Sequence, residues 1–79
     1  MEKKVVIFST QFCTWCRRTK EFFKANSIKY IEKNVGNDLK AAKEMIKKSG
    51  QQGVPVIDIN GEIFVGFDEN ALKKALGIK

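Results

Sequence analysis

The sequence contains no histidine and only two cysteines. Catalysis by an imidazole that relays a proton, as in Ser-His-Asp and Cys-His hydrolases, is therefore excluded. A closed structural zinc site needs four ligands, mostly cysteine or histidine, and this chain cannot supply them alone. We accordingly expect no bound metal.

The chain is also short and has no long apolar run. The 79 residues leave room for one domain, so we predict a single domain spanning residues 1–79. The apolar run at residues 5–8 is too short for a signal peptide or a membrane span. The net charge of +6 is spread along the chain without the arginine-rich or aromatic interleaving of a nucleic-acid face. We therefore expect a cytoplasmic monomer that binds neither membrane nor nucleic acid.

Hydrophobic patterning predicts seven elements in the order β-α-β-α-β-β-α. The predicted strands are residues 5–8, 28–35, 54–59 and 62–65, and the predicted helices are residues 14–25, 38–48 and 69–76. The unbroken apolar run at 5–8 is typical of a strand buried on both faces, so this strand should be central. Asn60-Gly61 supplies the two positive-φ residues of a two-residue hairpin. Asn37 and Asp68 are predicted to cap the second and third helices.

Each predicted helix carries apolar residues at spacings of three and four, which indicates one face turned toward a core. These faces are Cys16, Thr19, Phe22 and Phe23 in the first helix, Leu39, Ala42, Met45 and Ile46 in the second, and Leu72, Ala75 and Leu76 in the third. Four phenylalanines, at positions 8, 22, 23 and 64, are expected in the core.

The cysteines follow the first strand directly and stand at the start of the first helix, as Cys13-Thr14-Trp15-Cys16. A C-x-x-C near a βαβ pattern is typical of a thioredoxin-like redox motif. Free backbone N–H groups and the partial positive charge of a helix start both favour the thiolate over the thiol at Cys13. Arg17, one turn later, is a candidate to add a cation to this effect. Cys16 should be the less exposed thiol that resolves the mixed disulfide formed by Cys13.

Two other interpretations of the cysteine pair remain open. A structural disulfide would close a four-residue loop, which constrains little of the unfolded chain. A metal cluster would need ligands from a second chain or an external thiol. For the neighbouring Trp15, which we expect to be exposed, stacking on the substrate and packing on Phe12 are equally open.

Four segments together resemble the glutaredoxin family, namely FSTQFCTWC at 8–16, SGQQGVP at 49–55, ING at 59–61 and VGFD at 65–68. The resemblance runs nearly end to end. It implies an α/β, thioredoxin-like fold with a four-stranded mixed sheet, an antiparallel last hairpin, helices on both faces and a cis peptide between Val54 and Pro55. It also implies a thiol-disulfide oxidoreductase in electron transport and cell redox homeostasis. Such an enzyme reduces protein disulfides or glutathione mixed disulfides, uses glutathione as its reductant and has no permanently bound cofactor.

The resemblance further implies a glutathione site. Val54 would pair its backbone with the extended tripeptide, and Pro55 would keep that backbone exposed. Asp68 would meet the γ-glutamyl amino group, while N–H groups at the helix start receive the carboxylate. An ordinary strand-initiating turn and an ordinary N-cap are the plainer alternatives. Besides Cys13 and Cys16 as catalytic residues, the candidate substrate-binding residues are Phe12, Thr14, Trp15, Gln52, Val54, Pro55, Gly66, Phe67 and Asp68.

A second functional hypothesis rests on departures from that pattern. Gly66-Phe67 is similar to the glutaredoxin-like hydrogen donors of ribonucleotide reductase, whose electrons come from thioredoxin reductase. Thr10 and Gln52 stand where glutaredoxins commonly carry cations, whereas Asp68 stands where such donors commonly carry a basic residue. Thioredoxin reductase is therefore an alternative partner. A cluster-binding carrier is the third hypothesis.

Overall fold

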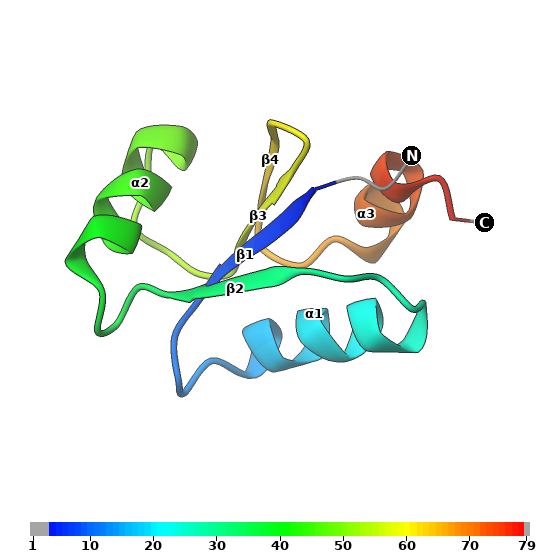
Figure 1. Ribbon diagram of the computed structural model, residues 1–79, viewed down its shortest axis with the longest axis horizontal. Helices are drawn as coiled ribbons and strands as arrows, with labels where there is room; N and C mark the ends of the chain where they lie inside the picture. Colours follow the sequence, from blue (N-terminus) through cyan, green and yellow to red (C-terminus); the bar gives the residue numbers. More distant parts are fainter. Residues whose placement is uncertain (1–3, 79) are drawn as a thin grey trace.

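The computed structural model describes residues 4–78. Its elements are β1 (Val5–Ser9), α1 (Thr14–Ala25), β2 (Ile31–Asn34), α2 (Leu39–Ser49), β3 (Val56–Ile59), β4 (Glu62–Val65) and α3 (Glu69–Leu76) (Figure 1). The predicted order of elements is confirmed, and the bounds of α1, β4 and α3 agree with the prediction. No helix within the described part of the chain is long and apolar enough to cross a membrane.

The four strands form one mixed sheet in the order β2-β1-β3-β4. β1 pairs in parallel with β2 and antiparallel with β3, and β4 returns antiparallel to β3. The predicted central strand is therefore β1, and all five of its residues are buried. A parallel pair needs a crossover connection, which α1 supplies between β1 and β2.

Helices cover both faces of the sheet, as predicted (Figure 1). Because side chains alternate along β1, Val5 and Ile7 join the core that contains Phe23 of α1 and Leu72 of α3. Val6 and Phe8 point to the other face, where they join Met45 of α2. Phe8, Phe22 and Phe23 are buried as predicted, and Phe64 is half-buried against the first core.

The hairpin between β3 and β4 turns at Asn60-Gly61, with φ angles of 52° and 95°. Both central residues thus adopt the positive φ that a two-residue turn of the primed type requires, which confirms the prediction. The Oδ1 atom of Asp58 accepts a hydrogen bond from the Gly61 N–H at 2.7 Å. Asn60 also fastens the start of the first strand, since its Oδ1 accepts from the Lys4 N–H at 2.7 Å.

Two predicted strands are shorter in the structure. β2 begins at Ile31 rather than residue 28, because it is an edge strand that pairs only with Val6–Ser9 of β1. Ile28 and Tyr30 nevertheless pack against the core. β3 begins at Val56 rather than residue 54, and the proline before it has no N–H to donate to a ladder.

The prediction for α2 was wrong in two respects. Its N-cap is Asp38, not Asn37, because the Asp38 carboxylate reaches the Ala41 N–H at 3.2 Å. Its buried residues are Ala41 and Met45, so Met45 is confirmed, whereas Ala42 is half-buried and Leu39 and Ile46 are 70% and 39% exposed. The face that meets the sheet also includes the ion-paired Glu44 and Lys48, described below, so a pattern of apolar residues alone places this face only in part.

Candidate functional site

Cys13 is the N-cap residue of α1 and is half-buried. Its Sγ accepts a hydrogen bond from the Cys16 N–H at 3.1 Å, and its carbonyl accepts one from the Arg17 N–H at 3.1 Å. A hydrogen bond that a sulfur accepts stabilises negative charge on it. The predicted position of Cys13 at a helix start is thus confirmed, and its sulfur lies at the helix end that carries free N–H groups.

Cys16 lies one turn further and is only 1% exposed. Burial, together with a hydrogen bond to Cys13, raises the pKa of the Cys16 thiol to about 12. Two features oppose this rise, a hydrogen bond from the Thr10 backbone and the positive charge of Lys20. Both cysteines are free thiols. The pair therefore consists of one partly exposed sulfur and one enclosed sulfur that stays protonated at neutral pH.

A polar cluster next to Cys16 was not found by sequence reasoning. Lys20 Nζ lies 2.8 Å from Glu32 Oε2, and the buried Ser9 Oγ donates to the same oxygen at 2.8 Å. We call Ser9, Lys20 and Glu32 the sulfur-side cluster. The only sequence signal for it is that Lys20 follows Cys16 by four residues, which places the two on one helix face.

Lys20, four residues after Cys16, is a cation whose charge lowers the pKa of Cys16. Arg17, the residue expected to provide a cation, has an exposed side chain. Its effect on Cys13 stays a prediction.

Three segments distant in sequence meet at one end of the sheet. Val56 pairs with Phe8 and with Val65, so the residues before β3 and after β4 lie at the same end as the loop from β1 to Cys13. The Val54–Pro55 peptide is cis, as the family resemblance implies. Gly66, at φ 83°, donates its N–H to the Pro55 carbonyl at 2.8 Å. This end therefore brings together the predicted segments 12–16, 54–55 and 66–68.

The acidic residue of this end, Asp68, caps α3. Its Oδ1 accepts from the Ala71 N–H at 3.1 Å, so the N-cap interpretation is confirmed and the exposed carboxylate also faces solvent. Thr14 and Gln52 are exposed. A neighbour that sequence reasoning missed, Gln51, hydrogen-bonds both the N–H and the carbonyl of Gly53 and so fixes the loop before Val54.

The aromatic residues around the cysteines differ from the expected arrangement. Trp15 is 55% exposed, as predicted, but its ring centroid lies 6.4 Å from that of Phe67, and the Arg18 guanidinium sits 5.2 Å over its ring. Phe67 also contacts Phe22, at 5.7 Å. Phe12, the proposed packing partner of Trp15, is 92% exposed. Trp15 therefore packs toward Phe67, just before α3, rather than on Phe12.

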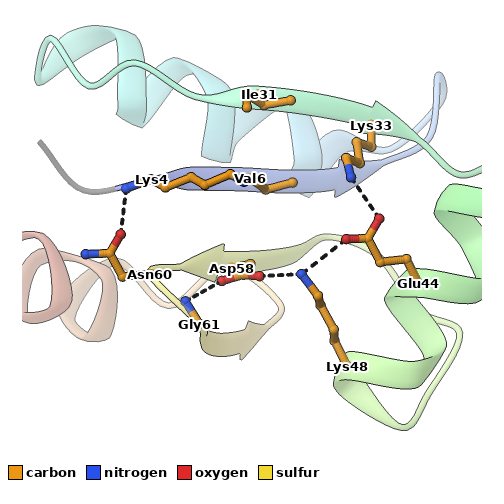
Figure 2. A pocket seen from close by; sticks show the side chains of 9 residues that line it. All are labelled: Lys4, Val6, Ile31, Lys33, Glu44, Lys48, Asp58, Asn60 and Gly61. Atoms are coloured by element: carbon orange, nitrogen blue, oxygen red, sulfur yellow. Dashed lines mark hydrogen bonds and ion pairs between the residues drawn. The ribbon is translucent and has the colours of Figure 1, made fainter.

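The described residues 4–78 contain no group of three or more cysteine, aspartate or glutamate side chains that could hold a metal ion. A cleft of about 450 Å³ on the α2 face is lined by none of the predicted site residues (Figure 2). Four residues in it form the α2-side cluster. Lys33 pairs with Glu44 at 2.8 Å, and Lys48 pairs with Glu44 at 3.1 Å and with Asp58 at 2.7 Å.

Asp58 is the most enclosed member of the α2-side cluster, at 8% exposure. Burial alone would raise its pKa, but hydrogen bonds from Lys48 and from the Gly61 N–H hold the pKa of this carboxyl below its usual value. The carboxylate is therefore charged and paired at neutral pH. Through Lys48 it joins α2 to β3, and through the Gly61 N–H it holds the turn of the hairpin (Figure 2).

Comparison with known proteins gives a consistent result. A glutaredoxin family model matches residues 5–65. A glutaredoxin-like 8.6 kDa protein in the rubredoxin operon of Clostridium pasteurianum is 43% identical over 72 residues, which cover 91% of this chain and 96% of that protein. Glutaredoxin 3 of Escherichia coli is 29% identical over 65 residues, 82% of this chain and 78% of that protein. The crystal structure of a thioredoxin-like protein variant has a TM-score of 0.91 at 29% identity and covers 96% of this chain and 97% of its own.

Proposed function

The chain belongs to the glutaredoxin family of thiol oxidoreductases, and from that premise we propose that it reduces protein disulfides and glutathione mixed disulfides with glutathione as its reductant. We propose that it does so as one domain, with Cys13 and Cys16 as its catalytic residues. The observation that carries this proposal is the inequality of the two thiols, one at a helix start and one enclosed.

Because Cys13 is partly exposed and Cys16 is enclosed, the two cysteines react in a fixed order. The Cys13 thiolate attacks one sulfur of the substrate disulfide, whose other sulfur leaves as a thiolate and takes up a proton. Cys16 then loses its proton and attacks Cys13 Sγ, which breaks the bond to the substrate sulfur. The protein ends with a Cys13–Cys16 disulfide, and two electrons have passed to the substrate. Two molecules of glutathione would restore the dithiol and leave as glutathione disulfide.

Two features of the cysteine end and the net charge of the whole chain support glutathione as the reductant. The half-buried Val54 precedes a proline, so its backbone groups are available to pair with an extended tripeptide. The start of α3 offers N–H groups and a partial positive charge to a carboxylate, and Asp68 offers a carboxylate to an amino group. The net charge of +6 favours an anionic tripeptide in general, and this attraction falls with salt.

Single substitutions of the two cysteines test the proposal. In a glutathione mixed-disulfide assay with glutathione, glutathione reductase and NADPH, we expect Cys13→Ser to be inactive, because no other sulfur can begin the exchange. We expect Cys16→Ser to keep deglutathionylation, because a second glutathione can replace the resolving thiol. Equal loss in both variants would contradict the proposal.

The same assay distinguishes the electron source. Activity with the glutathione system and none with thioredoxin reductase and NADPH is the expected result. The reverse would favour the hydrogen-donor alternative. One contact favours that alternative, since Phe67 fills the space between Trp15 and Phe22 beside the start of α3.

A further inference from the structure

The resolving step needs a proton to leave a sulfur that the protein encloses. We propose that Lys20, held in place by Glu32 and Ser9, is a positioning residue for this step, because its ammonium stabilises Cys16 as a thiolate while Cys16 attacks the mixed disulfide. The proposal rests on the dithiol mechanism given above. It assigns a role in this step to the sulfur-side cluster, whose residues lie outside the C-x-x-C motif.

Lys20 is well placed for this role. It follows Cys16 by one turn of α1, so both lie along the same side of the helix. Its side chain is 27% exposed, less than a freely extended surface lysine. The hydrogen bond to Glu32 raises the pKa of Lys20, so the ammonium stays charged while its field acts on Cys16.

The anchor of Lys20 comes from two strands. Glu32 Oε2 accepts one hydrogen bond from Lys20 and another from Ser9, both at 2.8 Å. The Lys20 bond lowers the pKa of Glu32 most, so this carboxylate is charged at neutral pH. Ser9 is fully buried at the end of β1 and directly precedes Thr10, whose backbone bonds to the Cys16 sulfur. The Thr10 backbone and Lys20 both favour a Cys16 thiolate, and both are therefore positioned by the residues at the end of β1.

The moment at which Lys20 matters follows from the covalent state of Cys13. In the resting dithiol, burial, a hydrogen bond to Cys13 and the charge of Cys13 all disfavour a Cys16 thiolate. Once Cys13 is bonded to the substrate sulfur, it carries no charge and has no proton or thiolate to share. Burial alone then opposes the Cys16 thiolate, and the Thr10 backbone and Lys20 favour it. The first exchange thus removes two of the three causes that raise the pKa of Cys16, so we expect Cys16 to ionise more readily at the step in which it must attack.

Several charged and titratable groups act on Cys16 and Lys20. Cys16 faces Cys13 and Lys20 on α1 and the Thr10 backbone from the loop after β1. Lys20 in turn faces Glu32 on β2 and Tyr30 just before β2. Glu32 also feels Lys24 on α1. The pH profile of the resolving step therefore depends on the pKa of Cys16, which these neighbouring groups shift.

The first exchange at Cys13 and the resolving step at Cys16 can be measured separately, because a disulfide reagent releases one coloured thiol at each step. Reduced protein mixed with dithiobis-nitrobenzoate releases one nitrothiobenzoate as Cys13 forms the mixed disulfide and a second as Cys16 resolves it. We expect Lys20→Met to slow the second release by about tenfold, the change that one pH unit of thiolate ionisation gives, and to shift its pH profile to higher pH. The first release should keep its rate, which also shows that the variant is folded.

Three further variants sharpen the test. Lys20→Arg keeps the cation and should restore most of the second release. Glu32→Gln keeps the shape but loses the anchor charge, and should slow the same release by less than Lys20→Met does. Lys43→Met removes an exposed cation from α2 and is the matched control, which should leave both releases unchanged.

Two results would overturn the proposal in different ways. If the second release in Lys20→Met keeps the wild-type rate and pH profile, the role of Lys20 is wrong and the dithiol mechanism stands. If the wild-type protein releases only one nitrothiobenzoate, the dithiol mechanism itself fails, and the role of Lys20 fails with it.

Discussion

The two faces of the sheet carry two ion-pair clusters whose surroundings differ. Neighbouring residues of β2 supply both, because Glu32 points toward α1 and joins the sulfur-side cluster, while Lys33 points toward α2 and joins the α2-side cluster. The first lies next to an enclosed thiol. The second lies between a helix, a hairpin and the ring of Phe8, with Lys33 Nζ 5.8 Å from the ring centroid. In our proposal, similar ion pairs therefore assist chemistry on one face and hold α2 against the sheet on the other.

This comparison separates stability from reactivity. The pairs of the α2-side cluster join elements that few apolar contacts hold together, since only Ala41 and Met45 of α2 are buried. The sulfur-side cluster adds to a well-packed face, where α1 buries Cys16, Thr19, Phe22 and Phe23. We therefore expect changes in the α2-side cluster to act on unfolding, and changes in the sulfur-side cluster to act on disulfide exchange.

The largest stability effect should come from Lys48→Met, which leaves Asp58 without its cation. Because Asp58 is nearly enclosed, we expect the free energy of unfolding to fall by about 1–2 kcal/mol, as for a buried group that loses a partner. Urea denaturation followed by circular dichroism measures this. Lys20→Met, by contrast, removes a partly exposed pair and should cost less than about 1 kcal/mol. If Lys48→Met altered the rate of the second nitrothiobenzoate release, the separation of the two clusters would be wrong.

A smaller effect should appear in the acid dependence of stability. The folded protein holds the pKa of Asp58 and of Glu32 below their usual values. A group whose pKa is lowered by folding contributes stability above its unfolded pKa, about 4, and loses it as the pH falls through the folded pKa. We therefore expect the midpoint of urea unfolding to fall below about pH 4, and Asp58→Asn to weaken this dependence more than Glu32→Gln. An equal or reversed effect of the two variants would contradict the greater enclosure of Asp58.

Sequence reasoning located the features that depend on neighbouring residues. The bounds of α1 and α3, the cap at Asp68, the hairpin at Asn60-Gly61 and the start of α1 at the cysteines all follow from local pattern. The cis peptide and the mixed character of the sheet, in which the third strand runs antiparallel to the first, were available only through the family resemblance.

The features it missed depend on side chains that the fold brings together. Ser9, Lys20 and Glu32 belong to three elements, and nothing in their spacing shows that one carboxylate oxygen receives both donors. The inward face of α2 was predicted correctly at Met45 but wrongly at Leu39 and Ile46, because Glu44 and Lys48 occupy inward positions that a hydrophobic pattern counts as outward. The packing of Trp15 on Phe67 likewise depends on how α1 meets the start of α3.

The central claim is that Cys13 is accessible and reactive whereas Cys16 is enclosed and protonated. Alkylation of each thiol in the reduced, folded protein tests this claim most directly. With iodoacetamide at neutral pH and peptide mass spectrometry, we predict that Cys13 is modified rapidly and that Cys16 remains a thiol, because Cys16 is 1% exposed and its pKa is raised to about 12. In urea, both should react at similar rates, which shows that the fold causes the difference. Equal modification of the two cysteines in the folded protein, or faster modification of Cys16, would contradict this account.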